Sequence, residues 1–216
     1  MRVDNAVGYK ERRDGLSQEW CELLDDWNAI PILLPNTCKN IGLLIKNANL
    51  VILTGGNDIV LDGRGAIVEG GNNSAIERDT QEYKIIDYCI SNSIPILGVC
   101  RGMQVLNYYF GGSLKPVDKK NHVGIRHKIT ILNGPFKGVF GKTKIVNSFH
   151  NFGISNESLG DELRVLAVSN DSFVEALYHI DHPIVGIMWH PERNMVFSDM
   201  EKNLVMEMIN KKSESL

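Results

Sequence analysis

A cysteine between two glycines is the first place in this chain where chemistry could occur. Gly98, Cys100 and Gly102 stand between a short apolar run, 94–99, and a stretch, 103–110, whose apolar residues recur at helical spacing. This is the Gly-x-nucleophile-x-Gly pattern of a nucleophile elbow, with cysteine in place of serine. The glycines remove side chains that would collide where a strand turns sharply into a helix. The pattern predicts that Cys100 projects from a sheet at a helix N-terminus, which favours the thiolate.

A matching base follows another apolar run. His190-Pro191-Glu192 comes directly after the predicted strand 184–189. In extended backbone, residues two apart point the same way, so Glu192 could orient one ring nitrogen of His190. The other nitrogen would then take the thiol proton and pass it to a leaving amine. Alone, the cysteine pattern would fit a buried structural residue, and the His190-Pro191-Glu192 segment would fit a solvated strand end. The presence of both in one chain favours catalysis.

The elements that must position these residues alternate in the first half of the chain. Helical patterns cover 16–28, 37–47, 76–92 and 103–110, and short apolar runs predict strands at 30–34, 50–53 and 94–99. Such alternation is typical of a parallel sheet with helices on both faces, where sites lie at the carboxyl ends of the strands. Gly55-Gly56 and Cys100 both follow predicted strands and should share that edge.

The second half has a different character. Strand-like segments at 122–132, 142–149, 163–169, 173–179 and 183–189 are separated by turn residues, and 170–172 predicts a hairpin. A last helix covers 200–210 and precedes a polar, frayed tail at 211–216. The prediction is an α/β fold with a mostly parallel central sheet and a small antiparallel section. The Gly- and Asn-rich stretch 57–75 is interpreted as a lid over the site, with a disordered surface loop as the alternative.

Composition narrows the function classes. The chain has 216 residues, is 43% hydrophobic and carries a formal net charge of −3, which suits one domain without affinity for nucleic acid. There is no apolar run of membrane-spanning length and no signal-peptide core, so we expect a cytoplasmic protein that binds no membrane. The cysteines form no C-x-x-C pair and no metal-ligand spacing, which suits a reducing compartment. Apart from Cys100, we interpret them as packing or surface residues: Cys21, Cys38 and Cys89.

Four segments also carry a resemblance to a known family. They are Gly98-Val-Cys-Arg-Gly-Met-Gln104, Thr54-Gly-Gly-Asn-Asp58, Asn147-Ser-Phe-His150 and Gly186-Ile-Met-Trp-His-Pro-Glu-Arg193. In this order they resemble the class I glutamine amidotransferase superfamily, and more narrowly its γ-glutamyl hydrolase branch, which includes γ-glutamyl-γ-aminobutyrate hydrolases. The likeness runs from about Asp14 to the last helix. It implies one domain over 1–216 with a flavodoxin-like three-layer sandwich.

The resemblance assigns roles to particular residues. It implies a Cys100–His190–Glu192 triad and an oxyanion hole made by the backbone N–H groups of Gly56 and Arg101. It also implies contacts to the substrate from Gly55, Gln104, Asn147, Ser148, Phe149 and His150. Among these, Gln104 would contact the glutamyl moiety, and the backbone of 148–150 would hold its α-amino and α-carboxylate groups. The substrate is then a small γ-glutamyl compound; no metal or cofactor is needed, and the oligomeric state stays open, a homodimer included.

Three departures from the family pattern stand out. Phe152 and Met188 each stand where glutamine is common, so substrate selection beyond glutamate can differ. The family also begins with a short apolar strand inside the sheet, and 1–4 corresponds only to about its end. Losing that strand would leave unpaired backbone on its neighbours. We therefore expect a start upstream of Met1 and a more stable protein when the chain is extended; the alternative is a sheet completed in another way.

The leaving group is the least defined part of the prediction. The pattern Glu11-Arg12-Arg13-Asp14-x-Leu16-x-x-x-Trp20, with 147–152, resembles a subgroup linked to surface-polysaccharide pathways. There, γ-glutamyl-CDP-amidate is cleaved to glutamate and cytidine diphosphoramidate. A diphosphate needs cations or backbone N–H groups. The candidate cations are Arg12, Arg13, Arg64, Arg78 and Arg193, and for each the alternative is a solvated or ion-paired surface arginine.

Other functions remain open at this point. A glutaminase subunit would pass ammonia to a synthase, which requires a partner and a tunnel. A γ-glutamyl-γ-aminobutyrate hydrolase would use the same site with another leaving group. A non-catalytic binding or stress-response protein would keep an oxidisable cysteine, but such proteins usually lack the His190-Pro191-Glu192 segment.

Overall fold

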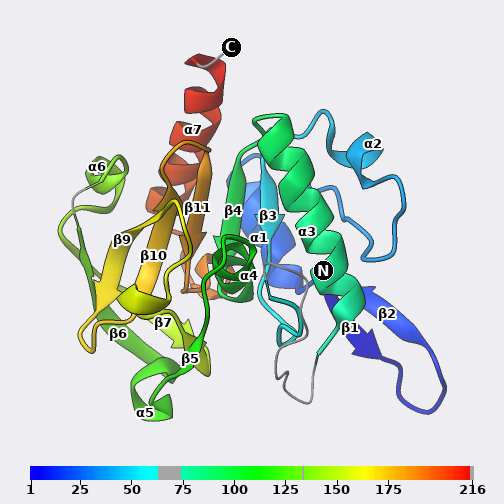
Figure 1. The fold of residues 1–216 in the computed structure, drawn as a ribbon, viewed down its shortest axis with the longest axis horizontal. Helices are drawn as coiled ribbons and strands as arrows, with labels where there is room; N and C mark the ends of the chain where they lie inside the picture. The colour runs from blue at the N-terminus through cyan, green and yellow to red at the C-terminus, as the bar shows by residue number, and fades with distance from the viewer. Residues whose placement is uncertain (63–73, 133, 215–216) are drawn as a thin grey trace.

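A single seven-stranded sheet forms the centre of the molecule (Figure 1). The computed structural model describes residues 1–62, 74–132 and 134–214. Across the sheet the strands are β3 (Val51–Leu53), β4 (Ile96–Val99), β11 (Ile184–Ile187), β10 (Val174–His179), β9 (Leu163–Ser169), β6 (Val123–Ile131) and β7 (Thr143–Phe149). β4 is parallel to both β3 and β11, and the remaining neighbours pair antiparallel. The antiparallel section therefore continues the parallel one and is larger than the sequence indicated.

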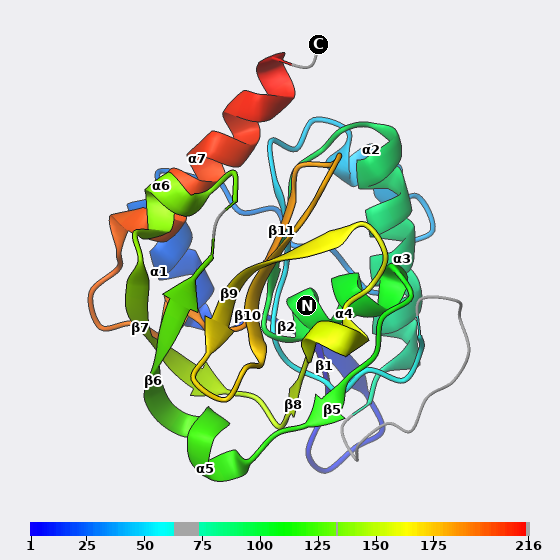
Figure 2. The ribbon, with the colours of Figure 1, turned by 60° about the vertical axis from the view of Figure 1, so that its left-hand side comes forward.

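Helices cover both faces of the parallel strands, as Figure 2 shows. The helices are α1 (Gln18–Asp26), α2 (Ile41–Ile45), α3 (Ile76–Ser91), α4 (Arg101–Tyr109), α5 (Lys119–His122), α6 (Lys137–Phe140) and α7 (Asp199–Glu214). Leu97 and Val185 pack in a core cluster with α1 and α7, whereas Ile96 and Ile184 pack in another with α3 and α4. This alternation follows from the twofold periodicity of side chains along a strand. The α/β fold with a layer of helices on each face confirms the expected fold class.

One predicted strand is wrong. Residues 30–34 have no regular structure, and the side chains of Ile30, Ile32 and Leu33 are exposed. An apolar run becomes a strand only where a neighbour accepts its backbone hydrogen bonds, and no described strand lies in register with this segment. β3 has β4 as its one partner and forms the edge of the sheet.

Two small ribbons lie outside the main sheet and were not predicted. One pairs β1 (Arg2–Asn5) with β2 (Arg12–Gly15), and the other pairs β5 (Lys115–Pro116) with β8 (Phe152–Gly153). The first is attached to the loop after β3, because Val3 N donates to Asn57 Oδ1 and Asn57 Nδ2 donates to Val3 O, both at 2.8 Å. Residues 2–5 pair within a hairpin and not with β3. Whether the chain extends upstream stays a prediction.

The remaining predicted elements lie close to where the sequence placed them. The hairpin at 170–172 joins β9 to β10, and the last helix runs on into the residues interpreted as a tail. The lid prediction at 57–75 falls largely on 63–73, which lie outside the described residues. Within the part of the chain that is described, no helix is long and apolar enough to cross a membrane.

The corner between β4 and α4 is closely packed. A Cβ atom added at Gly102 would lie 1.9 Å from the carbonyl oxygen of Leu53, and one added at Gly98 would lie 2.7 Å from the carbonyl carbon of Gly102. Both distances are far below van der Waals contact, and both involve backbone that cannot rotate away. Glycine at these two positions is what lets α4 start directly above the parallel strands.

We therefore expect Gly102→Ala to lower the free energy of unfolding by about 3 kcal/mol or more, because α4 must move away from β3. Urea denaturation measures this loss. Gly138→Ala is the matched control, since no atom lies within 4 Å of the added methyl group, and it should change stability by less than about 1 kcal/mol. Equal effects of the two substitutions would contradict the packing argument.

Candidate active site

Cys100 occupies the corner itself. Its backbone has φ 53° and ψ −107°, a conformation that L-residues rarely adopt. Cys100 N donates to the carbonyl of Ile187 on the neighbouring strand at 2.8 Å, and its own carbonyl accepts from Gln104 N at 3.1 Å. The strained residue is thus held from the sheet on one side and from α4 on the other, so the position of its sulfur is fixed.

His190 is held by two side chains. Its Nδ1 lies 2.6 Å from Glu192 Oε1, and both residues are buried. Asn147 binds the backbone on both sides of the ring: its Oδ1 accepts from His190 N at 2.8 Å, and its Nδ2 donates to His190 O at 2.7 Å. The sequence argument assumed extended backbone here, whereas a 3-10 turn, Pro191–Arg193, follows His190. The turn brings Glu192 to the ring by a different route.

The structure brings Cys100 and His190 into contact. Burial lowers the pKa of His190, but the charge and hydrogen bond of Cys100, together with Glu192, outweigh it and raise the pKa to about 9. Gly55 flanks the pair, since a Cβ atom there would lie 2.8 Å from His190 Cε1 and 3.7 Å from Cys100 Cβ. A raised pKa means that the imidazolium form persists at neutral pH beside the sulfur. The His190 ring is therefore placed as a protonated acid beside the Cys100 sulfur.

The backbone around the sulfur offers donors for an oxyanion. Arg101 is the first residue of α4, so its N–H has no carbonyl four residues earlier in the helix to bind. Gly56 has φ +130°, and a Cβ atom there would lie 2.6 Å from Arg78 Nη1. These are the two residues that the resemblance assigned to the oxyanion hole. Their conformations are compatible with that role, which stays a prediction.

A buried charged network joins the two oxyanion segments. Arg101 forms ion pairs with Asp79 and Glu82 of α3, and Arg78 Nε pairs with Glu82 at 2.8 Å. Arg78 Nη2 also donates to the carbonyl of Thr54 at 2.6 Å. Burial raises the pKa of Glu82, but Arg101 and Arg78 outweigh it and lower the pKa to about 2. Arg78, proposed from sequence as a diphosphate ligand, is instead fully engaged in this network.

Among the predicted substrate residues at 104 and 148–150, Phe149 is exposed and the others are buried. Phe149 is 41% exposed, and its ring meets the His190 ring edge-on with centroids 5.9 Å apart. Gln104 is buried and donates from Nε2 to the carbonyl of Phe152 at 2.9 Å. Ser148 and His150 are buried and point elsewhere: Ser148 Oγ donates to the carbonyl of His122, and His150 lies against the His122 ring. Any role of Ser148 and His150 in binding glutamate would therefore fall to their backbone.

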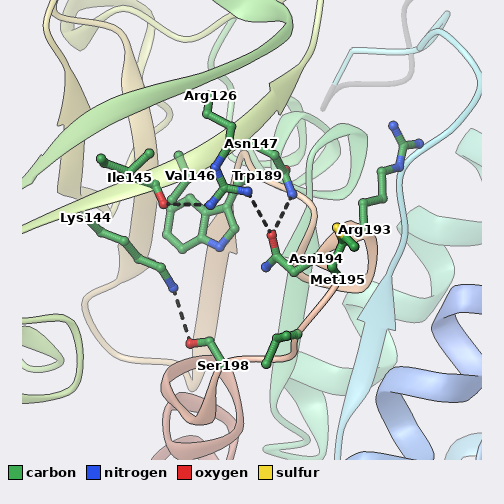
Figure 3. Close-up of a pocket in the computed structure, with 11 residues that line it drawn as sticks. Arg126, Lys144, Ile145, Val146, Asn147, Trp189, Arg193, Asn194, Met195 and Ser198 are labelled. Carbon is green, nitrogen blue, oxygen red and sulfur yellow. Dashed lines mark hydrogen bonds between the residues drawn. The ribbon is translucent and has the colours of Figure 1, made fainter.

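A pocket with a cationic lining lies beside Asn147 and Trp189 (Figure 3). It encloses about 400 Å³ and includes Asn147 and Arg193 in its lining. Arg126 and Lys144 add two further cations, and none of the described residues that line it is acidic. Lys144 is paired with Glu201 at 2.8 Å, while the Arg193 guanidinium lies over the Phe149 ring, 4.8 Å from its centroid. Phosphate oxygens are the ligands that such a lining suits.

Of the candidate arginines within the described residues, Arg193 alone lines this pocket. Arg12 and Arg13 are ion-paired with Glu77 and Glu11, and Arg64 lies outside the described residues. Arg126 and Lys144 were not predicted, because neither belongs to a recognised motif. Strand pairing places Arg126 opposite Asn147, and Lys144 lies on the same strand as Asn147.

Comparison with known proteins identifies the family. The chain matches the model of the Peptidase C26 family over residues 2–192 and belongs to that family of class I glutamine amidotransferases. It is 34% identical over 191 residues to the gamma-glutamyl-CDP-amidate hydrolase of Campylobacter jejuni, covering 86% of this chain and 84% of that protein. It is 32% identical over 204 residues to a putative glutamine amidotransferase of Schizosaccharomyces pombe, covering 87% and 77%. Family and relatives support a hydrolase.

Solved structures agree on the fold. A putative GMP synthase component from Thermoplasma acidophilum superposes with a TM-score of 0.69 at 21% identity, covering 92% of this chain and 88% of that one. At this identity the likeness establishes the architecture of the sheet and its helices. The site itself rests on the geometry given above.

The raised pKa of His190 leads to a prediction. Glu192→Gln removes a charge and a hydrogen-bond acceptor that raise this pKa, so the basic limb of the kcat/KM profile should move from about pH 9 to lower pH. We also expect kcat to fall about 10²- to 10⁴-fold, because the ring loses its orientation. Steady-state kinetics of glutamate release over a pH series measures both effects.

Glu157→Gln is the matched control. Glu157 is an exposed carboxylate paired with Lys115 and should leave both the rate and the limb unchanged. A Glu192→Gln enzyme with the wild-type basic limb would show that this carboxylate does not act on His190.

Proposed function

We propose that this protein is a cysteine-dependent hydrolase of γ-glutamyl amide bonds. The observation that carries the proposal is the contact between Cys100, at a strained corner, and His190, whose Nδ1 lies 2.6 Å from Glu192. Nucleophile, base and orienting carboxylate are the parts that acyl transfer requires. The family assignment supports the same class of reaction.

The first half-reaction forms a γ-glutamyl thioester. The Cys100 thiolate attacks the δ-carbonyl carbon, and the developing oxyanion accepts hydrogen bonds from the N–H groups of Gly56 and Arg101. His190, protonated in the resting pair, donates its proton to the leaving nitrogen as the C–N bond breaks. A general acid whose pKa lies near 9 holds that proton at neutral pH. Glu192 keeps the ring in the orientation that this transfer needs.

The second half-reaction releases glutamate. His190, now neutral, takes a proton from water, which attacks the thioester carbon. The C–S bond breaks, Cys100 leaves as thiolate, and the imidazolium is restored. Over both half-reactions, one water is consumed, and one glutamate and one leaving-group molecule are released. Neither step requires a redox change.

For the leaving group we propose cytidine diphosphoramidate, so that γ-glutamyl-CDP-amidate is the substrate. Two observations support this choice. The Campylobacter relative at 34% identity bears the name of that activity. The pocket beside Asn147 presents Arg126, Lys144 and Arg193, which could bind a diphosphate. An ammonia leaving group carries no anionic group and γ-aminobutyrate carries one carboxylate, whereas a diphosphate can bind several cations.

The test is a panel of γ-glutamyl amides assayed for glutamate release by the purified protein. We expect kcat/KM to be highest for γ-glutamyl-CDP-amidate and lower for γ-glutamyl-γ-aminobutyrate and for glutamine, with no release by Cys100→Ala. A preference for γ-glutamyl-γ-aminobutyrate would overturn the proposed substrate but keep the reaction. Glutaminase activity that appears only with a partner synthase would favour the amidotransferase role.

Pocket variants separate the nucleotide from the glutamyl moiety. Arg193→Ala should raise KM for the nucleotide conjugate about tenfold, equivalent to about 1.4 kcal/mol, and leave KM for glutamine unchanged. Arg164→Ala, an exposed arginine on β9 outside the pocket, is the control. Equal KM changes for both substrates would show that the pocket does not bind the nucleotide.

A further inference from the structure

Four ionisable side chains converge on one point outside the catalytic pair. They are His122 at the end of α5, His127 on β6, His150 after β7 and Glu175 on β10. His122, His150 and Glu175 are buried, and the side chain of His127 is 12% exposed. Glu175 Oε1 lies 3.6 Å from His122 Nδ1, 3.4 Å from His127 Nε2 and 3.7 Å from His150 Nε2. The mechanism above uses none of these side chains.

The carboxylate of Glu175 has no hydrogen-bond partner. Neither of its oxygens accepts a hydrogen bond from any residue within the described ranges, although both are inaccessible to solvent. The three ring nitrogens stand beyond, or badly directed for, ordinary hydrogen bonding. A buried carboxylate that faces only neutral rings is costly, so a positive charge is expected among these four side chains.

The outer nitrogens of the three rings are all occupied by acceptors. His122 Nε2 lies 2.9 Å from Asp171 Oδ2, His127 Nδ1 lies 3.1 Å from the carbonyl of Asn121, and His150 Nδ1 lies 3.0 Å from the carbonyl of Phe152. Acceptors at these positions favour ring protons on the outer nitrogens, which leaves His122 Nδ1 and His150 Nε2 facing each other at 3.2 Å as two lone pairs. In the neutral rings, the inner nitrogens then present lone pairs toward Glu175.

This arrangement is typical of metal ligands. Histidines that bind metals usually donate their other N–H to a carboxylate or a backbone carbonyl, which fixes the tautomer and the ring orientation. Ligand atoms at about 2.0–2.1 Å from a tetrahedral zinc ion lie roughly 3.3–3.4 Å from one another. Glu175 Oε1 lies 3.4–3.7 Å from the three inner ring nitrogens, and His122 Nδ1 is 3.2 Å from His150 Nε2. The ligand atoms of His122, His127 and Glu175 all lie within 4.8 Å of one another.

We propose that His122, His127, His150 and Glu175 bind one divalent transition-metal cation of the zinc class. Three imidazoles and one carboxylate form an N3O donor set that suits zinc better than calcium or magnesium, which prefer oxygen. The cation would neutralise Glu175 and satisfy all three inner lone pairs at once. The cation would position the segments that carry its ligands and would take no part in the reaction, because no ligand belongs to the catalytic pair.

The cation would join segments that are distant in sequence. It would connect β6, β10 and the segment directly after β7, the strand that supplies Asn147 and Phe149 to the catalytic side. The carbonyl of Phe152 links the two regions, since it accepts from both His150 Nδ1 and Gln104 Nε2. This inference does not depend on the proposed substrate.

The experiment is zinc titration of the full chain after removal of metal by chelation. Binding is measured by competition with a chromophoric chelator, and Cys100→Ala is used as the starting protein so that the catalytic thiol cannot bind zinc. We expect one equivalent of zinc to bind and the melting temperature to rise. When added to Cys100→Ala, the substitutions His127→Gln and Glu175→Gln should each weaken zinc binding at least tenfold. His127 is the least buried ligand, so its replacement should least disturb folding.

His182→Gln is the matched control, a histidine outside the cluster that should leave zinc affinity unchanged. The alternative to a metal ion at this cluster is a proton shared between Glu175 and the histidine rings. Absence of zinc binding by the folded starting protein would overturn the proposal in favour of the proton. Zinc binding with the same affinity in His127→Gln, Glu175→Gln and His182→Gln would also overturn it, since the cation would then lie elsewhere.

Discussion

The close approach of α4 to the two strands beneath it is the constraint on which the active site depends. The backbone of Gly102 touches the carbonyl of Leu53, and Gly98 faces the start of the same helix. No side chain fits at either contact. The helix can therefore begin one residue after Cys100, which is left with φ 53°. Parallel pairing then brings the base alongside, because Val99 is in register with Ile187 and His190 follows three residues later.

Strain at such a corner costs about 1–3 kcal/mol and persists only where the surroundings over-determine it. Here the surroundings are polar as well as apolar. Arg101 next to the nucleophile is buried against Asp79 and Glu82, and Arg78 continues the network to the loop after β3. Removing one partner of such a network leaves an uncompensated buried charge, whereas the complete network pairs both arginines with carboxylates. The charges thus hold α3, α4 and the Thr54–Asn57 backbone in one arrangement.

The sequence was most informative where function depends on local pattern. The glycine spacing around Cys100 and the His190-Pro191-Glu192 segment could be recognised because steric and hydrogen-bonding demands act over a few residues. Strand prediction failed at 30–34, where an apolar run has no neighbour to pair with. Nor could spacing reveal the charged network or the cluster around Glu175. Their members are separated by up to 53 positions and meet only through the order of strands in the sheet. Even the contact between Glu192 and the His190 ring forms through a turn and not through the extended backbone that was expected.

The central claim is that His190 activates the sulfur of Cys100. The most direct measurement is the rate at which iodoacetamide alkylates Cys100 at pH 7 in the wild-type protein and in His190→Ala, followed by mass spectrometry with the exposed Cys21 as internal reference. The account predicts that His190→Ala slows alkylation of Cys100 about tenfold or more while Cys21 reacts at the same rate, because the thiolate is the reactive form. An unchanged ratio of the two rates would contradict it.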